Sequence, residues 1–198
     1  HSVSETVIPE YNDAFVRDNF DFATMAEYEA SVRKTLAEER QDEIAAEKQS
    51  ATLAVAVDNA EVLKYPEGVV EDYMAQQIDY VRYYAAQYGM SYADFVSAAT
   101  GEDVETYEAA VRTGAEQSVK EELVIWAIAE AENFTISDER RASELASLLS
   151  YYNYDDLASM CEAYGFTEEY MNRTMTYSIY YVDALDMLVE NATFTGAK

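Results

Sequence analysis

Glycine and proline are scarce in this chain, and their scarcity limits the folds open to it more than any other feature. The 198 residues include 6 Gly and 2 Pro, whereas ordinary proteins contain about 7% Gly and 5% Pro. Gly and Pro punctuate strands and tight turns, so a chain with so few of them favours long helices. We therefore predict an all-α fold in which strands have almost no room.

Capping signals place the ends of the predicted helices. Thr24 with Glu27 resembles a capping box, Pro66 suits the first turn of a helix, and Gly89 suits the position just after one. Residues 1–10 alternate apolar and polar side chains, which predicts an extended lead-in. Helices are predicted at 24–58, 66–88, 103–132, 155–165 and 167–190, with two more beginning near Ser91 and Ser137.

Three of these helices lose their polar face near one end, at residues 51–57, 123–129 and 182–189. A helix that is apolar all round is a buried one, so the three ends are predicted to meet in one core. Residues 38–48 are polar on most sides and are predicted to lie in water. The pattern indicates an elongated helical body with arms.

Short sequences also recur along the chain. YEASVR at 28–33 returns as YEAAVR at 107–112, and YGMS at 88–91 returns as YGFT at 164–167. The offsets, 79 residues (28 to 107) and 76 residues (88 to 164), nearly agree. We interpret them as a degenerate helical repeat of about 75 residues, with chance matching of short strings as the alternative.

Charge excludes several classes of partner. The formal net charge is -26, from 39 acidic and 13 basic residues, and it would repel the phosphates that dominate nucleic-acid affinity and the anionic surface of a membrane. The sequence contains no run of about 18 or more apolar residues, which is the length needed to span a bilayer. Because 49% of the residues are hydrophobic, the chain can still bury a core. We predict no nucleic-acid partner and no membrane insertion of this chain.

Catalytic machinery is missing from the sequence. The only histidine is His1 and the only cysteine is Cys161, so no triad or zinc site that depends on histidine can be assembled. Cys161 is predicted to be a buried structural thiol, with a reactive role as the alternative. The carboxylates show no EF-hand spacing, and no glycine-rich phosphate loop occurs. We assign no catalytic residue, metal ligand or cofactor, and an enzyme that uses clustered carboxylates stays the least favoured hypothesis.

Aromatic side chains exceed what the predicted core needs. In the helix from Pro66, a stripe from Val70 to Tyr88 is predicted to be core, and further apolar residues lie beside it. The last predicted helix repeats this arrangement. Tyr and Met suit surfaces that contact many partners, although a second packing interface within the fold is the alternative. The candidate client-binding residues are Val69, Tyr80, Tyr83, Met90, Met175, Tyr177, Tyr180 and Tyr181.

The order of several short motifs resembles a known family. The residues that carry the resemblance are Ile8, Pro9, Glu10, Asp13, Phe15, Phe22, Glu27, 32–34, 65–67, 88–91, Val119, Lys120, 127–133 and 137–139. In this order and spacing they resemble the C-terminal domain of trigger factor, a family of bacterial chaperones that need no ATP. The resemblance covers nearly all of the chain and weakens after Ser150.

The resemblance implies an all-α body with two arms that form a cradle, related to the peptide-binding module of periplasmic chaperones such as SurA. It implies one chaperone domain over 1–198, with 1–22 as the lead-in from a missing upstream FKBP-type prolyl isomerase domain. Within it we expect a first long helix and return at 24–65, an arm at 66–136 and the closing helices of the body at 137–198. Isomerase activity and ribosome binding do not carry over to this chain.

The resemblance implies a holdase that binds unfolded or nascent polypeptides and is not itself an enzyme. A helical interaction module for one dedicated partner is the alternative, and a homodimer is compatible with either function. The family implies a cytoplasmic location. The richness in tyrosine and the weak match after Ser150 leave a cell-surface or extracytoplasmic lipoprotein as the second possibility.

Overall fold

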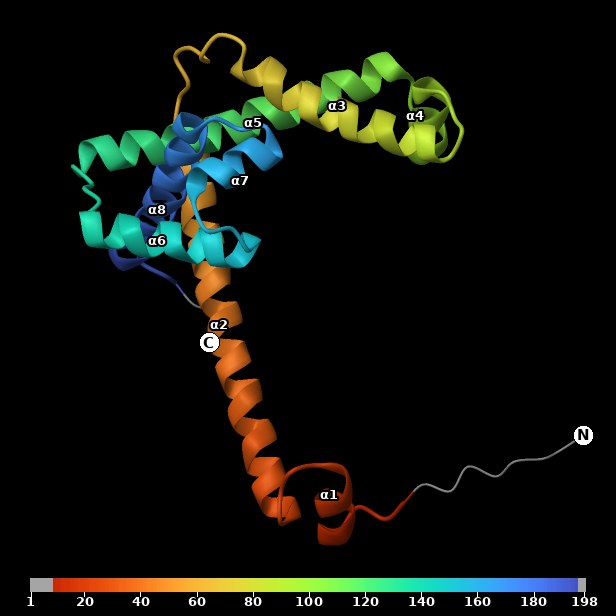
Figure 1. Ribbon diagram of the computed structural model, residues 1–198, viewed down its shortest axis with the longest axis vertical. Helices are drawn as coiled ribbons and strands as arrows, with labels where there is room; N and C mark the ends of the chain where they lie inside the picture. Colours follow the sequence, from red (N-terminus) through yellow and green to blue (C-terminus); the bar gives the residue numbers. More distant parts are fainter. Residues whose placement is uncertain (1–8, 196–198) are drawn as a thin grey trace, which may run out of the picture. The chain divides into compact units, whose positions relative to one another are not determined.

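The structure is a computed structural model of the chain and describes residues 9–195 (Figure 1). Within that range it contains eight α-helices and no strand, which confirms the all-α prediction. The helices are α1 (Asp13–Asn19), α2 (Met25–Asn59), α3 (Val69–Gln87), α4 (Tyr92–Thr100), α5 (Val104–Ala131), α6 (Asp138–Tyr152), α7 (Leu157–Tyr164) and α8 (Glu168–Asn191). The predicted extended lead-in falls mostly on residues 1–8, which lie outside the described range.

Most predicted helix ends lie within a residue or two of the observed ones, and the larger differences have local causes. Helix α3 begins at Val69 rather than at Pro66, because Gly68 takes the N-cap position with a positive φ of 80°. Helix α7 is capped by Asp156, whose carboxylate accepts a hydrogen bond from the Ser159 amide, and not by Asp155. Helix α1 lies within the predicted lead-in and was not predicted from the sequence.

Two compact units divide the chain, at His1–Ala51 and Thr52–Lys198. In the first unit the Asn12 side chain caps α1, and Asp13 accepts a hydrogen bond from the amide of Met25 at the start of α2. The rings of Phe20 and Tyr28 stack at 4.4 Å between centroids. Every side chain from 38 to 48 is exposed, which confirms that this polar stretch lies in water.

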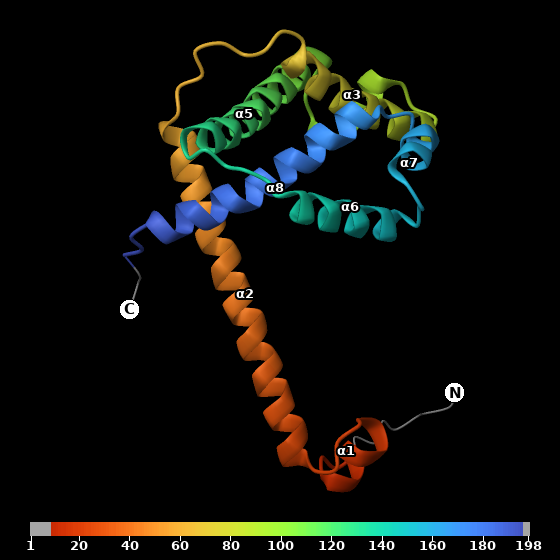
Figure 2. The same ribbon diagram turned by 60° about the vertical axis from the view of Figure 1, so that its left-hand side comes forward.

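Helix α5 is the shared element of the second unit (Figure 2), because it packs against α3 and against α8. Its C-terminal half contributes to a core with the end of α2 and with α8. The buried members of this first core are Leu53, Val57, Val124, Ile125, Ala184 and Leu185. They come from the three apolar helix ends, so the prediction that those ends meet in one core is confirmed.

A second, smaller core joins the N-terminal half of α5 to α3. Its buried members are Val70, Ala115 and Val119, and α4 packs against both helices at the far end of this pair (Figure 1). The predicted core stripe of α3 is only partly correct: Val70 and Ala85 are buried, whereas Tyr88 is 71% exposed. A narrow contact with one neighbouring helix covers less of α3 than the stripe predicted.

The local geometry at the recurring YGMS and YGFT segments is the same. Gly89 and Gly165 both have positive φ, at 65° and 73°. The following amides of Met90 and Phe166 donate to the carbonyls of Ala85 and Cys161, each at 2.9 Å. Each segment therefore ends one helix with a left-handed residue and leads directly into the N-cap of the next.

Candidate functional site

An apolar hollow lies between α6 and α8, with a volume of about 380 Å³. Its apolar lining side chains are Leu148, Tyr151, Met171, Met175, Ile179 and Val182. Arg140, Glu144 and small hydroxyl side chains complete its walls. A volume of this size falls within the range of about 300–1,000 Å³ that is typical of ligand sites.

The hollow stays open because α6 does not pack closely onto α8. None of the 15 residues of α6 is buried, and its leucines at 145, 148 and 149 are half-buried. Near the N-terminal end of α6, Arg140 forms an ion pair of 2.8 Å with Asp183, and this contact raises the pKa of Arg140 above its ordinary value. The apolar face of α6 therefore borders an open space instead of a closed core.

An aromatic ladder continues from the hollow over neighbouring helix ends. Its rings belong to Tyr151, Tyr152, Tyr164, Phe166 and Tyr170. Successive centroids are 5.0, 5.7, 6.3 and 5.2 Å apart, which is the range of favourable ring contacts. All five side chains are exposed, and Tyr151 is 81% exposed. Because Tyr151 also lines the hollow, the hollow and the ladder form one continuous apolar surface.

A second exposed group, the α3 tyrosine cluster, consists of Tyr80, Tyr83 and Tyr84. The ring of Tyr84 lies 4.8 Å from that of Tyr80 and 5.5 Å from that of Tyr83. Tyr80 and Tyr83 are each 60% exposed. This helix face therefore presents apolar rings to solvent, whereas the sequence alone left an exposed surface and a second packing interface both open for Tyr80 and Tyr83.

The eight predicted client-binding residues do not line one cavity. Tyr80, Tyr83 and Met90 are exposed, whereas Met175 is nearly buried at the floor of the hollow. Val69 is half-buried against the second core. The three tyrosines at positions 177, 180 and 181 are half-buried against the first core. Their role in binding stays a prediction.

Tyr180 shows what the half-buried tyrosines do within the fold. Its hydroxyl donates a hydrogen bond to the carbonyl of Phe134 at 3.2 Å. Its ring lies 5.6 Å from that of Trp126 and 5.9 Å from that of Phe134. These contacts hold the segment after α5 against α8, which is the internal packing role considered as the alternative for the surplus aromatic residues.

Four rings of the ladder were not predicted as binding residues from the sequence: Tyr151, Tyr152, Tyr164 and Phe166. Helical periodicity finds side chains that share one face of one helix, but these residues come from the ends of different helices. One sequence feature could have pointed to Tyr151 and Tyr152: this aromatic pair directly precedes Asn153, which ends α6 in a left-handed conformation. The recurring YGFT segment supplied two of the rings.

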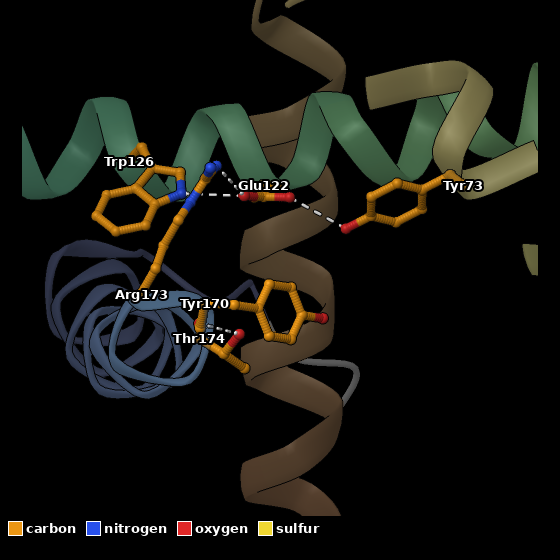
Figure 3. Close-up of polar contacts among 6 residues, drawn as sticks. All are labelled: Tyr73, Glu122, Trp126, Tyr170, Arg173 and Thr174. Carbon is orange, nitrogen blue, oxygen red and sulfur yellow. Dashed lines mark hydrogen bonds and ion pairs between the residues drawn. The ribbon is translucent and has the colours of Figure 1, made fainter. Parts of the chain in front are cut away.

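A polar node on α5 connects three helices (Figure 3). The carboxylate of Glu122 accepts hydrogen bonds from the Tyr73 hydroxyl at 3.0 Å, from Trp126 Nε1 at 3.2 Å and from Arg173 at 3.2 Å. The Glu122 side chain is only 19% exposed. Burial and the nearby carboxylate raise the pKa of Tyr73, so its hydroxyl keeps its proton and donates.

Within residues 9–195, no group of His, Cys, Asp and Glu side chains is placed to hold a metal ion. Over the same range, no helix is both long and apolar enough to cross a membrane. Cys161 is 4% exposed, as predicted for a buried thiol. Burial, followed by the charge of Glu168, raises its pKa and disfavours the reactive thiolate.

The described residues thus define an all-helical domain with two cores on one shared helix and an exposed apolar surface beside them. The chain belongs to the trigger factor C-terminal family. The family model described as "Bacterial trigger factor protein (TF) C-terminus" matches residues 24–190.

Curated relatives agree with this family. The chain is 31% identical over 159 residues to the trigger factor of Ligilactobacillus salivarius, which covers 80% of this chain and 36% of the relative. It is 27% identical over 192 residues to the trigger factor of Bacillus subtilis, which covers 96% of this chain and 43% of the relative. The chain therefore spans less than half the length of these relatives.

Proposed function

We propose that this chain is a chaperone domain that holds unfolded or nascent polypeptides without ATP, and that the hollow and the aromatic ladder are its main contact surface. The observation that carries the proposal is the continuity of the two, since Tyr151 belongs to both. Exposed apolar surface of this kind is typical of interaction sites. Membership of the trigger factor family supports the same function.

Energetics favour many weak contacts over one tight site. Burial of apolar surface contributes about 25 cal/mol per Å², so a client side chain that buries roughly 100 Å² gains about 2.5 kcal/mol. Tyrosine presents a large apolar face and loses little conformational freedom on binding. Several such contacts add up to reversible holding, while the net charge of -26 keeps the loaded domain dispersed.

The α3 tyrosine cluster and Met90 would act as a second contact area. Within this proposal Met175 forms the floor of the hollow, and Val69, Tyr177, Tyr180 and Tyr181 contribute edges that a client reaches only in part. The chain itself carries out no chemical reaction and binds no nucleic acid. The cytoplasmic location remains a prediction that rests on the family, and a homodimer remains a prediction that is compatible with either function.

The test is suppression of aggregation of a chemically denatured protein by the isolated chain, followed by light scattering. We expect the native sequence to suppress scattering, and the double variant Tyr151→Ser with Tyr170→Ser to need several-fold more protein for the same effect. Leu63→Ser is the matched control, because Leu63 is 90% exposed and lies outside the hollow and the ladder.

Two results would overturn the proposal. The first is failure of the folded native chain to suppress aggregation at molar excess. The second is equal loss of activity in the Leu63→Ser control, which would show that the ladder has no special role. Capture of a single stoichiometric protein, with no binding of unfolded chains, would favour the dedicated interaction module instead.

A further inference from the structure

The polar node at Glu122 lies where the two cores of the second unit meet. Val119 belongs to the core shared with α3, and Val124 belongs to the core shared with α8. Glu122 lies between these positions on α5. The buried members of the two cores have no residue in common, so α3 and α8 are each anchored to a different half of α5.

Glu122 joins the two sides directly. One carboxylate oxygen accepts from Tyr73 of α3, and the other accepts from Arg173 of α8 and from Trp126 of α5. Figure 3 shows Tyr73 and Arg173 approaching this side chain from opposite sides. A carboxylate with three donors in a largely covered position holds its partners more firmly than an exposed ion pair does.

The two helices that the node joins also carry parts of the two exposed aromatic groups: α3 carries the α3 tyrosine cluster, and α8 carries Tyr170 of the ladder, whose other rings lie on α6, on α7 and in the turn before α8. Tyr80 lies two turns after Tyr73 on α3, and Tyr170 lies one turn before Arg173 on α8. Tyr170 ends the aromatic ladder. A change in the angle between α3 and α8 would therefore change the distance between the α3 tyrosine cluster and the Tyr170 end of the ladder.

We propose that Glu122 is a positioning residue, which latches α3 to α8 and thereby fixes the spacing of the two apolar surfaces. Glu122 does not touch a client; it acts through Tyr73 and Arg173. The part of this proposal that concerns clients rests on the proposed function, whereas the latch itself does not.

The latch is tested without any client, by pulsed electron resonance between spin labels on α3 and α8. The labels are attached at Gln87→Cys and Glu190→Cys in a Cys161→Ala background, since both positions are exposed. We expect one narrow distance distribution for the parent and at least a doubling of its width for Glu122→Ala. Glu122→Gln should stay narrow, because its amide oxygen can still accept from Trp126 and Arg173 while its NH2 group donates to the Tyr73 hydroxyl.

A matched control distinguishes the loss of the Glu122 contacts from the mere loss of a negative charge on α5. Glu130→Ala removes an exposed carboxylate from the same helix and should leave the distribution unchanged. Circular dichroism confirms that each variant is folded. If Glu122→Ala does not fold, two other variants test the latch. Tyr73→Phe and Arg173→Gln each remove one hydrogen bond to Glu122, and each should widen the distance distribution. The latch would be overturned if those of Glu122→Ala, Tyr73→Phe and Arg173→Gln that fold all kept a distribution as narrow as the parent's.

A second arm measures the consequence for clients. The probes are a permanently unfolded protein, made by reducing and alkylating a small disulfide-bonded domain, and a short peptide cut from its sequence. Glu122→Ala should weaken binding of the long probe by about tenfold, because two linked contacts depend on their spacing. Binding of the short peptide should be unchanged, because each surface is intact.

The outcomes of the two arms are distinguishable. If the native chain binds neither probe, the proposed chaperone function fails, and the spin-label result still decides the latch. If the native chain binds both probes and Glu122→Ala widens the distances without weakening the long probe, the latch exists but does not set client spacing. That result would overturn the client part of the proposal.

Discussion

Several tyrosine hydroxyls have a raised pKa in this fold. Burial, helped by the carboxylates of Glu121 and Glu122, raises the pKa of Tyr177 well above its ordinary value. Burial together with Glu122 raises the pKa of Tyr73, and burial together with Glu121 raises the pKa of Tyr181. In the unfolded chain these hydroxyls would titrate near pH 10, so the folded state holds protons that the unfolded state releases.

This difference predicts a loss of stability in alkali. Above about pH 10 the unfolded chain binds fewer protons than the folded one, so the free energy of unfolding falls as pH rises. Urea unfolding followed by the fluorescence of Trp126, the single tryptophan, measures that slope. Tyr177→Phe should flatten it. A free energy of unfolding that is constant or rising between about pH 10 and pH 11 would contradict the prediction.

At the scale of single helices, caps matter most where packing is weakest. Helix α6 has no buried residue, so its stability depends on its ends more than that of α5 does. The Ser137 hydroxyl caps α6 by accepting a hydrogen bond from the amide of Arg140 at 3.2 Å. The adjacent ion pair between Arg140 and Asp183 then fixes this end against α8.

We therefore expect Ser137→Ala to cost about 1 kcal/mol and to loosen α6 before the rest of the second unit. Hydrogen exchange of the α6 amides should speed up, while amides at the centre of α5 stay protected. Ser143→Ala, at an exposed position within α6, is the control and should leave the exchange pattern unchanged. Equal acceleration throughout the second unit would show that α6 is not a separate weak element.

The sequence was a good guide to helices whose ends carry side-chain caps, such as Ser91, Asp103 and Thr167. It was a poorer guide where backbone conformation decides the boundary, as at Gly68, or where a helix is short, as α1 is. The apolar ends of α2, α5 and α8 were predictable as one core, because a helix without a polar face has to be covered on all sides.

At the scale of the whole second unit, stability and the proposed function compete for the same space. Ser178 lines the hollow and is exposed. Ser178→Leu should fill part of the hollow, raise the free energy of unfolding by about 1 kcal/mol and weaken the suppression of aggregation. Ser143→Leu adds the same side chain outside the hollow and should change neither quantity. If Ser178→Leu is more stable but suppresses aggregation to the same extent as the native chain, the hollow does not take part in client binding.

The candidate site was harder to predict than the fold, because it depends on which helices fail to pack closely. The sequence shows that α6 has an apolar face with Leu148, but not that α8 leaves that face uncovered. The surplus of tyrosine was visible in the composition. Its division between internal packing, as for Tyr180, and exposed rings, as for Tyr151, depends on tertiary contacts that no single helix encodes.

The ladder has one further consequence, because four of its five rings come from helix termini or the turn between helices. Terminal turns rotate at small energetic expense, whereas whole helix axes are held by their cores. The rings can therefore tilt individually to follow the contour of whatever segment arrives. The ability to fit clients of different shape would then reside in the helix ends, and the packed helices themselves would not have to move.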